Sequence, residues 1–241
     1  NDPKNIFSDI FGIGPKKAQE LVEKKNITTL EELKKQQDAV LNDKQKIGLN
    51  YYEDILKRIP RGEISEFEKY INQAFDEVKT IDAKYEIVGS YRRGAKTSGD
   101  IDIIVTSDSK DVFKKFIDLL IEKQIIVEVL SKGSTKSLVI AKLPGYSTAR
   151  RVDFMHTSKE EYPFAILYFT GSKFFNTVMR GRALSMKYSL NEHGIYHMDG
   201  KKRGGKVDRI FQDERAIFSF LKMEYKEPRE RIDSRSIVAL P

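Results

Sequence analysis

The 241-residue chain contains no cysteine and only three histidines. The lack of cysteine excludes a disulfide framework, a thiolate-ligated zinc site and a thiol nucleophile, and it fits an intracellular protein. The histidines, His156, His193 and His197, are not spaced as a set of metal ligands. We therefore expect packing or surface roles for them.

The chain also lacks any hydrophobic run close to the length of a membrane span. Its first seven residues, NDPKNIF, contain neither the basic nor the apolar region of a secretory signal. We therefore expect no membrane partner and no secretion signal. The missing initiator methionine indicates a trimmed or partial chain.

Charge is only mildly biased, with 43 Lys and Arg against 36 Asp and Glu, a net +7. This balance leans toward a polyanionic partner, but it fits a soluble basic enzyme equally well. No segment is a basic tail, so particular residues would have to bind a nucleic acid. The 39% of hydrophobic residues are enough for a folded core.

Apolar periodicity divides the chain into three expected domains, residues 1–60, 61–159 and 160–241. The first is helical with short loops, and Pro60 marks its end. The second opens with one helix over 61–85 and continues with a further helix around 112–120 and strands near 85–88, 99–105, 125–130, 138–143 and 151–154. The third returns to helices, with turns at Gly194 and 201–205. Strands mixed with helices, without strict alternation, predict an α+β fold.

Two carboxylates, Asp100 and Asp102, are the strongest chemical signal. On a strand, residues i and i+2 point to the same face, so both would converge while Ile101 and Ile103 face the core. Carboxylate oxygens are ligands for hard divalent cations such as Mg²⁺. A third acid, Asp153, lies in a similar alternating segment. An isolated Asp-x-Asp pair is more often an exposed edge or turn.

A possible phosphate-binding turn precedes this pair. Gly89 and Ser90 follow an expected strand, Arg93 lies three residues on, and Ser98 and Gly99 come next. Backbone N–H groups, hydroxyls and a guanidinium suit an anion. Metal carboxylates beside a phosphate site are the arrangement that nucleotidyl transfer needs. Their joint occurrence within residues 89–102 favours that chemistry over the structural explanation.

These residues resemble a known family. The segments GSYRRGA (89–95) and SGDID (98–102) are similar to the palm motif of family X DNA polymerases of the beta and lambda type. YFTGS (168–172), with Asn176 and Arg180, resembles the thumb motif, GIGP (12–15) the helix-hairpin-helix and YKEPRER (225–231) the C-terminal signature. The four blocks stand in family order. The resemblance implies helix-hairpin-helix fingers, a nucleotidyltransferase-type palm with a mixed β-sheet and a helical thumb, and no N-terminal lyase domain.

The resemblance also implies roles at matching positions. Asp100 and Asp102 would hold two Mg²⁺ ions, for which Mn²⁺ is an expected substitute, and Asp153 would hold the catalytic ion. All three are the expected catalytic residues. The expected nucleotide-binding residues are Arg58, Ser90, Arg93, Ser98, Gly99, Tyr168, Phe169, Gly171 and Asn176.

The implied DNA contacts lie in all three domains. Gly12 and Gly14 of the hairpin, Lys132, Lys136, Arg151 and Arg180 would contact DNA, with Arg151 near the primer terminus. The backbone carbonyls of Ser8, Ile10 and Ile13 would hold a monovalent cation, Na⁺ or K⁺, that bridges to a DNA phosphate.

The sequence thus predicts a template-directed DNA polymerase that fills gaps in DNA repair, such as base excision repair, without lyase activity. Its expected partners are primer-template or gapped DNA and a dNTP; we expect a monomer, with a repair ligase as a candidate partner. The expected location is the nucleus, a viral particle or a cytoplasmic viral factory. Two alternatives stay open: a template-independent terminal or small-molecule nucleotidyltransferase, and a non-catalytic DNA-end-binding protein.

Overall fold

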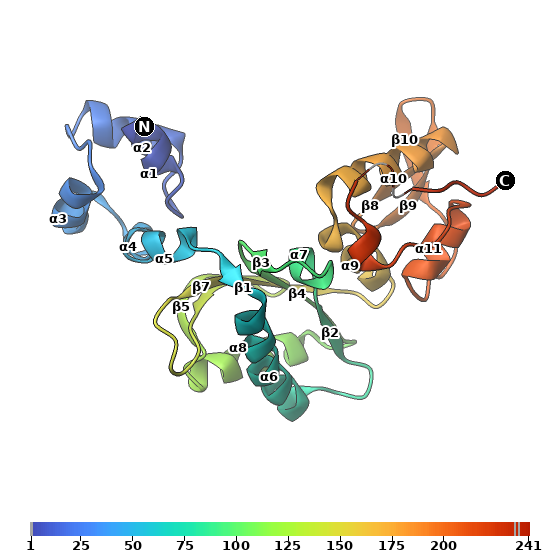
Figure 1. Cartoon of the computed structure of the whole chain (residues 1–241), viewed down its shortest axis with the longest axis horizontal. Coiled ribbons are helices and arrows are strands. Elements are labelled where there is room, and N and C mark those ends of the chain that lie inside the picture. The colour runs from blue at the N-terminus through green and yellow to red at the C-terminus, as the bar shows by residue number, and fades with distance from the viewer. Residues whose placement is uncertain (1, 234, 236) are drawn as a thin grey trace.

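The computed structural model describes residues 2–233, 235 and 237–241. Two lobes rise from the same side of a central sheet, as the arms of an open U (Figure 1). The N-terminal helices form one arm, and the C-terminal third of the chain forms the other. None of the helices in the described part of the chain combines the length and apolarity that a membrane span needs.

The first arm consists of short helices around a small core of its own. These are α1 (Pro3–Ser8), α2 (Pro15–Glu23), α3 (Leu30–Val40), α4 (Asp43–Asn50) and α5 (Tyr52–Leu56). Pro15 begins α2, where its missing N–H costs no hydrogen bond. Thr29 caps α3 by accepting from the Glu32 N–H. Phe7, Leu21 and Leu33 are fully buried in this core.

The central sheet has the strand order β2-β4-β7-β6-β5. Its strands are β2 (Lys84–Ile87), β4 (Ile101–Thr106), β5 (Ile126–Lys132), β6 (Lys136–Ala141) and β7 (Arg150–Thr157). Only β4 and β7 pair in parallel, and the other neighbours are antiparallel. The sheet is therefore mixed, as expected. A short pair, β1 (Ile59–Pro60) with β3 (Thr97–Ser98), joins the first arm to the sheet domain.

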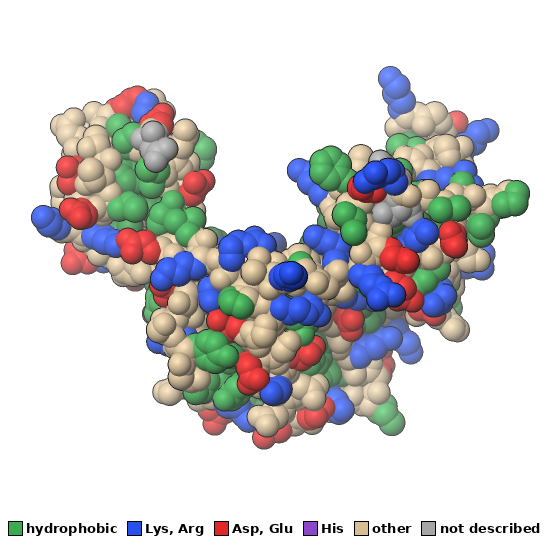
Figure 2. Space-filling model, viewed as in Figure 1, with side chains coloured by type: hydrophobic (Ala, Val, Ile, Leu, Met, Phe, Trp, Pro, Cys, Tyr) green, Lys and Arg blue, Asp and Glu red, His purple; other side chains and the backbone are tan. Residues whose placement is uncertain are grey.

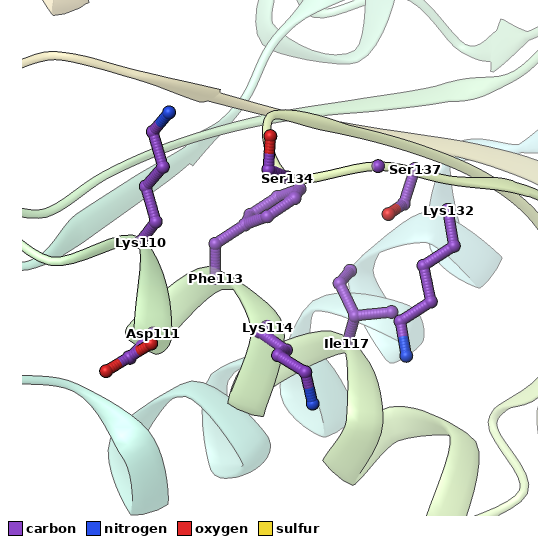
Figure 3. Close-up of a pocket in the computed structure, with 9 residues that line it drawn as sticks. Lys110, Asp111, Phe113, Lys114, Ile117, Lys132, Ser134 and Ser137 are labelled. Atoms are coloured by element: carbon purple, nitrogen blue, oxygen red, sulfur yellow. The ribbon is translucent and has the colours of Figure 1, made fainter.

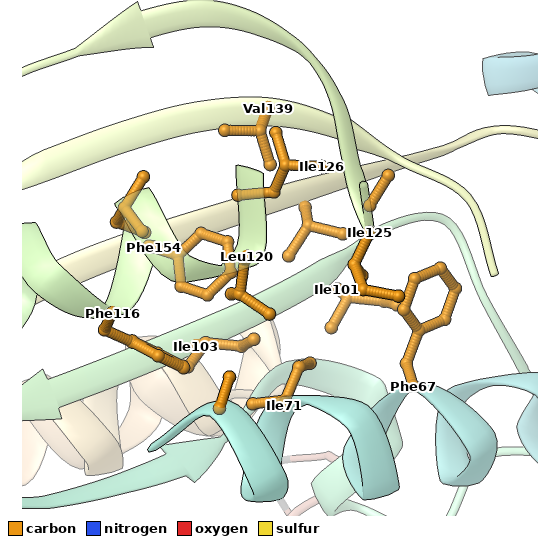
Figure 4. Packing of buried hydrophobic residues seen from close by; sticks show 14 of the residues in the cluster. Phe67, Ile71, Ile101, Ile103, Phe116, Leu120, Ile125, Ile126, Val139 and Phe154 are labelled. Carbon is orange, nitrogen blue, oxygen red and sulfur yellow. The ribbon is translucent and has the colours of Figure 1, made fainter. Parts of the chain in front are cut away.

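Helices α6 (Arg61–Val78) and α8 (Lys110–Glu122) cover one face of the sheet. Phe67, Ile71 and Phe116 from these helices pack on Ile103 and Phe154 of the strands (Figure 4). The opposite face contacts both arms, through Leu130 and Ile140 toward the first arm and through Ile104 toward the second. The short helix α7 (Gly89–Arg92) lies on that side.

The predicted helix over 61–85 is too long. Helix α6 ends at Val78, since Lys79 is already extended. Thr80 donates to the Asp82 carboxylate, and Asp82 accepts from the Asp108 N–H. Such local side-chain bonds compete with helical hydrogen bonding.

The second arm contains helices α9 (Tyr162–Thr170), α10 (Lys173–Ser185) and α11 (Glu214–Phe220), with a 3₁₀ turn at η1 (Pro228–Glu230). It also contains a sheet that the sequence did not predict, formed by β8 (Tyr188–Asn191), β9 (Gly194–Asp199) and β10 (Lys202–Lys206). β10 reads KRGGK and is exposed throughout, so it has no apolar alternation that could identify a strand. The chain end packs back on this arm, where Glu224 N–H donates to Val238 O at 2.9 Å.

Candidate active site

Three carboxylates converge on the open face of the sheet. Asp102 of β4 is paired directly with Asp153 of the parallel strand β7, and Asp100 precedes β4. One oxygen from each carboxylate lies within 4.8 Å of the other two. Ile101 and Ile103 point to the core, with 1% and 0% exposure. The alternation of side chains along the strand therefore orients Asp100 and Asp102 to one face, as expected. The parallel pairing of β4 with β7 brings Asp153 beside them.

Partial burial raises the pKa of all three groups, and repulsion between carboxylates raises it further for Asp100 and Asp102. Burial, followed by the charges of Asp100 and Asp153, raises the pKa of Asp102 to about 7. Burial and the Asp153 charge raise the pKa of Asp100, and burial raises that of Asp153. Three carboxylates at this spacing are a poor arrangement for isolated anions. They suit divalent cations, because oxygen ligands and negative charge are what Mg²⁺ requires.

Arg151 is the cation closest to this cluster. Its Nε donates to Asp153 Oδ1 at 2.8 Å, and its charge lowers the pKa of all three acids. Its guanidinium carbon also lies 4.9 Å from the centre of the Phe11 ring in the first arm. Arg151 therefore links the helix-hairpin-helix arm to the carboxylates.

The turn at Gly89 borders the same cluster. Gly89 has a φ of +67°, and a Cβ there would lie 3.5 Å from Asp102 Oδ2. The hydroxyls of Ser90 and Ser98 are hydrogen-bonded at 2.6 Å. A side chain at Gly89 would be strained and would intrude beside the acids. The predicted phosphate-binding serines thus lie next to the carboxylates.

Two arginines extend this region on either side. Arg58 donates to Thr97 O at 3.0 Å, and its Nη1 would lie 3.4 Å from a Cβ at Gly99. Arg93 donates to the Thr170 carbonyl at 2.6 Å and lies 3.2 Å from the Cβ position of Gly171. In this structure, the Arg93 guanidinium therefore joins the sheet domain to the second arm.

The predicted nucleotide-selecting residues lie on α9 and α10. The rings of Tyr168 and Phe169 meet edge to face, 5.0 Å apart. Asn176 donates to the Tyr168 carbonyl at 2.7 Å, so its amide is engaged within the arm. Arg180, a predicted DNA contact, is exposed on α10.

The remaining predicted DNA contacts are dispersed. In the first arm, Gly12 has a φ of +86°, and Gly14, the residue before α2, has open space around it. Among the cation-binding carbonyls predicted there, that of Ile10 accepts from the Ile13 N–H at 3.0 Å, and Ser8 ends α1.

The two hairpin lysines of the sheet domain differ in their surroundings. Lys136 borders a cavity of about 70 Å³ that Asp102 and Asp153 also line. Lys132 instead forms an ion pair with Asp118 of α8. Only Lys136 is therefore brought to the carboxylates.

Sequence reasoning missed a charged network between the sheet domain and the second arm. Glu214 of α11 is 8% exposed and accepts from Arg92 of α7 and from the fully buried Arg231. Arg92 also donates to Glu86 and to the Thr170 hydroxyl. The two consecutive arginines at 92–93 could have drawn attention to Arg92. No feature of the neighbouring sequence identifies Glu214 as its partner.

Lys and Arg side chains gather on the floor of the hollow between the two arms and on the side of the second arm that faces it (Figure 2). The hollow lies on the carboxylate side of the sheet. A phosphate backbone seated there would meet positive charge from the floor and from the second arm.

A mixed sheet with three convergent acids, a serine-bearing turn and two flanking arms defines a nucleotidyltransferase-type palm with fingers and thumb. Comparison with known proteins agrees along the chain. Residues 5–56 match the fingers domain of DNA polymerase lambda, 58–159 the DNA polymerase beta palm and 165–232 the DNA polymerase beta thumb. The chain belongs to the DNA polymerase beta/lambda family, family X.

Individual relatives cover nearly the whole chain. DNA polymerase lambda of Arabidopsis thaliana is 33% identical over 94% of this chain and 46% of the relative. DNA polymerase lambda of Rattus norvegicus is 32% identical over 94% of this chain and 41% of the relative. DNA nucleotidylexotransferase of Xenopus laevis is 29% identical over 93% of this chain and 51% of the relative. The chain thus spans about half the length of these relatives or less. The exact boundaries at residues 60 and 159 stay predictions.

Proposed function

We propose that the chain is a template-directed DNA polymerase that adds dNMP to a primer 3′-OH and fills short gaps in DNA repair, including base excision repair. The observation that carries this proposal is the convergence of Asp100, Asp102 and Asp153 beside the Ser90 turn. The family and its named polymerase relatives support the same activity.

In the proposed reaction the primer 3′ oxygen attacks the α-phosphorus of a dNTP. The bond to the bridging oxygen of the β-phosphate breaks, and pyrophosphate leaves. The Asp153 carboxylate would accept the 3′-OH proton. Two Mg²⁺ ions, or Mn²⁺ as a substitute, held by the three acids would supply positive charge to the attacking and leaving oxygens.

The other residues would bind and orient the substrates. Ser90, Ser98 and Gly99 border the acids and would donate to the β- and γ-phosphates, with Arg58 and Arg93 adding charge from either side. The Tyr168–Phe169 segment would exclude a 2′-hydroxyl. Arg93 would have to share or release the Thr170 carbonyl, so nucleotide binding would change a contact between palm and thumb.

DNA would lie in the basic hollow between the arms. The open space beside Gly14 would let a phosphate approach the backbone closely, next to the left-handed turn at Gly12. A monovalent cation on the Ser8, Ile10 and Ile13 carbonyls would bridge to that phosphate. Lys136, Arg151 and Arg180 would contact the strands. Lys132 would first have to leave Asp118.

The broader expectations from the sequence stay proposals: a monomer, a repair ligase as partner, no lyase activity from these residues and an intracellular location. The first two are checked by light scattering and by pull-down with a purified ligase. The third is checked by a borohydride-trapping assay on an abasic-site substrate.

Primer extension tests the central proposal. Substrates with a one-nucleotide gap, with and without a 5′-phosphate, are compared with an open primer-template in the presence of Mg²⁺. We expect templated addition that EDTA abolishes and Mn²⁺ restores. If no dNTP is incorporated under any of these conditions, the non-catalytic DNA-end-binding alternative replaces this proposal.

A second candidate function is template-independent extension, because one relative is a DNA nucleotidylexotransferase. Extension of a single-stranded primer separates the two activities. A polymerase requires a template and selects the complementary nucleotide, whereas a terminal transferase extends the single strand with any nucleotide.

A further inference from the structure

The lysines around α8 are exposed charges on the helix-covered side of the central sheet. Lys110, Lys114 and Lys132 line a cavity of about 400 Å³ between α8 and the turn that joins β5 to β6 (Figure 3). Lys114 and Lys132 share the carboxylate of Asp118, whose side chain is 40% exposed. Exposed ion pairs of this kind hold their partners weakly. At the other end of the same side of the sheet, an ion pair is buried instead.

Glu63 and Arg150 form this buried, two-pronged ion pair. Glu63 lies in the first turn of α6, and Arg150 is the first residue of β7. Arg150 Nε donates to Glu63 Oε2 at 2.6 Å, and Nη2 donates to Oε1 at 2.9 Å. The two residues are 7% and 6% exposed. The pair therefore holds the start of β7 against the start of α6 in one defined geometry.

The same guanidinium also holds the segment that connects the first arm to the sheet domain. Its Nη1 donates to the carbonyl oxygens of Lys57 and Arg58, at 3.3 and 3.2 Å. The preceding Ala149 N–H donates to the carboxylate of Asp54 in α5 at 3.0 Å. The planar guanidinium of Arg150 thus engages two carboxylate oxygens and two carbonyls at once, which the point charge of a lysine does not reproduce.

This connecting segment carries Arg58, which the proposed function assigns to the incoming triphosphate. The side chain of Arg58 donates to the hydroxyl and the carbonyl of Thr97, at 3.2 and 3.0 Å, and lies beside Gly99. The strand that follows Arg58, β1, is only two residues long. The bond from Arg150 therefore adds an anchor for the Arg58 backbone on the side away from Thr97.

Strand alternation connects this anchor to the carboxylates. Arg150 shares the core face of β7 with Val152, whereas Arg151 and Asp153 lie on the opposite face, joined at 2.8 Å. Two consecutive residues of one strand thus contact the backbone of Arg58 and the carboxylate of Asp153. Their spacing along β7 sets the distance between the triphosphate-binding and metal-binding parts of the site.

We propose that Glu63 and Arg150 are positioning residues for nucleotide binding. They hold the backbone of Arg58 so that its guanidinium meets the β- and γ-phosphates of the dNTP, and neither touches the substrate itself. The inference rests on the proposed polymerase function and deepens it. Because the metal ligands stay in place when the pair is broken, KM for the dNTP should rise more than kcat falls.

The test is steady-state primer extension by the whole chain on a one-nucleotide gap. Arg150→Lys keeps the charge but removes the planar set of contacts. We expect KM for the dNTP to rise at least about fivefold, with kcat and DNA affinity within about twofold of the wild type. Glu66→Gln is the control, because it removes an exposed charge from the same helix. It should leave all three quantities unchanged.

A comparison with Arg58→Ala shows whether Arg150 acts through Arg58. In the Arg58→Ala background, Arg150→Lys should cause no further rise in KM, because the guanidinium that Arg150 positions is already absent. A purely structural effect of Arg150→Lys would instead be the same in both backgrounds.

The double variant Glu63→Leu/Arg150→Met separates positioning from stability. Replacing both members of a buried ion pair by apolar residues of similar volume is often neutral for folding. The bonds to the Lys57 and Arg58 carbonyls are nevertheless lost. The double variant should therefore keep the urea midpoint of the wild type and show the same rise in KM as Arg150→Lys.

Two results would overturn the inference and leave the proposed function intact. One is an unchanged KM for the dNTP in the folded Arg150→Lys or Glu63→Leu/Arg150→Met variant. The other is additivity of Arg150→Lys and Arg58→Ala in their effects on KM. Absence of extension by the wild-type chain is a separate outcome, which overturns the proposed function and this inference with it.

Discussion

Arg92 of the palm and Glu214 of the thumb form a two-pronged ion pair, with Nη2–Oε1 at 2.6 Å and Nη1–Oε2 at 3.0 Å. Arg92 belongs to the same four-residue helix as Ser90, so the pair ties the proposed phosphate-binding turn to α11. Arg231 approaches the same carboxylate from the other side. One acid therefore balances two largely buried guanidinium groups.

Glu214→Gln tests this tie. Removing the charge leaves Arg92 and Arg231 without their shared counter-ion, and breaking a buried pair costs about 3–5 kcal/mol. We expect a lower urea midpoint for the variant and slower nucleotide incorporation. Glu160→Gln, at an exposed position, is the matched control. A midpoint equal to that of the control would show that the network contributes nothing to stability.

Asp153→Asn tests the catalytic assignment. The substitution keeps the size of the side chain but removes a metal ligand and a proton acceptor, so primer extension should fall by at least about 10³-fold. DNA affinity, measured by fluorescence anisotropy, should change little. Asp199→Asn, at an exposed position on β9, should behave as the unmodified chain does. Extension at the original rate would make the assignment wrong.

Asp102→Asn tests the electrostatic strain in the cluster. The folded-state pKa of Asp102 is about 7, above the ~4 of an unfolded aspartate. Without metal, the wild-type fold therefore loses stability as pH rises from ~4 to about 7, because a repelled charge is formed. The variant lacks this charge. Its melting temperature at pH 8 in EDTA should exceed that of the wild type by about 2–4 °C, and the difference should shrink at pH 5. A difference that stays constant across this range would contradict an electrostatic origin.

Gly48→Ala tests the packing of the hairpin arm. A Cβ at Gly48 would lie 2.3 Å from the Phe11 carbonyl oxygen, so the Gly12 turn would have to move. We expect a loss of about 1–3 kcal/mol in stability, together with weaker DNA binding. Gly62→Ala is the control, since nothing lies within 4 Å of its Cβ position. If Gly48→Ala binds DNA as tightly as the control does, the Gly12 turn does not contribute to DNA binding.

Much of the site could be predicted because its parts are local. The Gly89–Asp102 segment places serines, an arginine and two acids within 14 residues, and strand alternation orients both acids to one face. The capping of α3 by Thr29 and the start of α2 at Pro15 were likewise predictable from adjacent residues. By contrast, strands β8–β10 were not predicted. They are defined by their pairing with one another within the thumb and not by an alternation of apolar residues.

The sequence by itself determined which side chains share a face, since the twofold repeat of a strand depends only on neighbouring residues. Tertiary structure alone decided that Asp102 lies directly beside Asp153, that Arg93 reaches Thr170 and that Glu214 meets Arg92. Those relations join residues 51, 77 and 122 positions apart. They depend on strand register and on how the arms pack, which result from the free energy of the whole core and not from any local pattern.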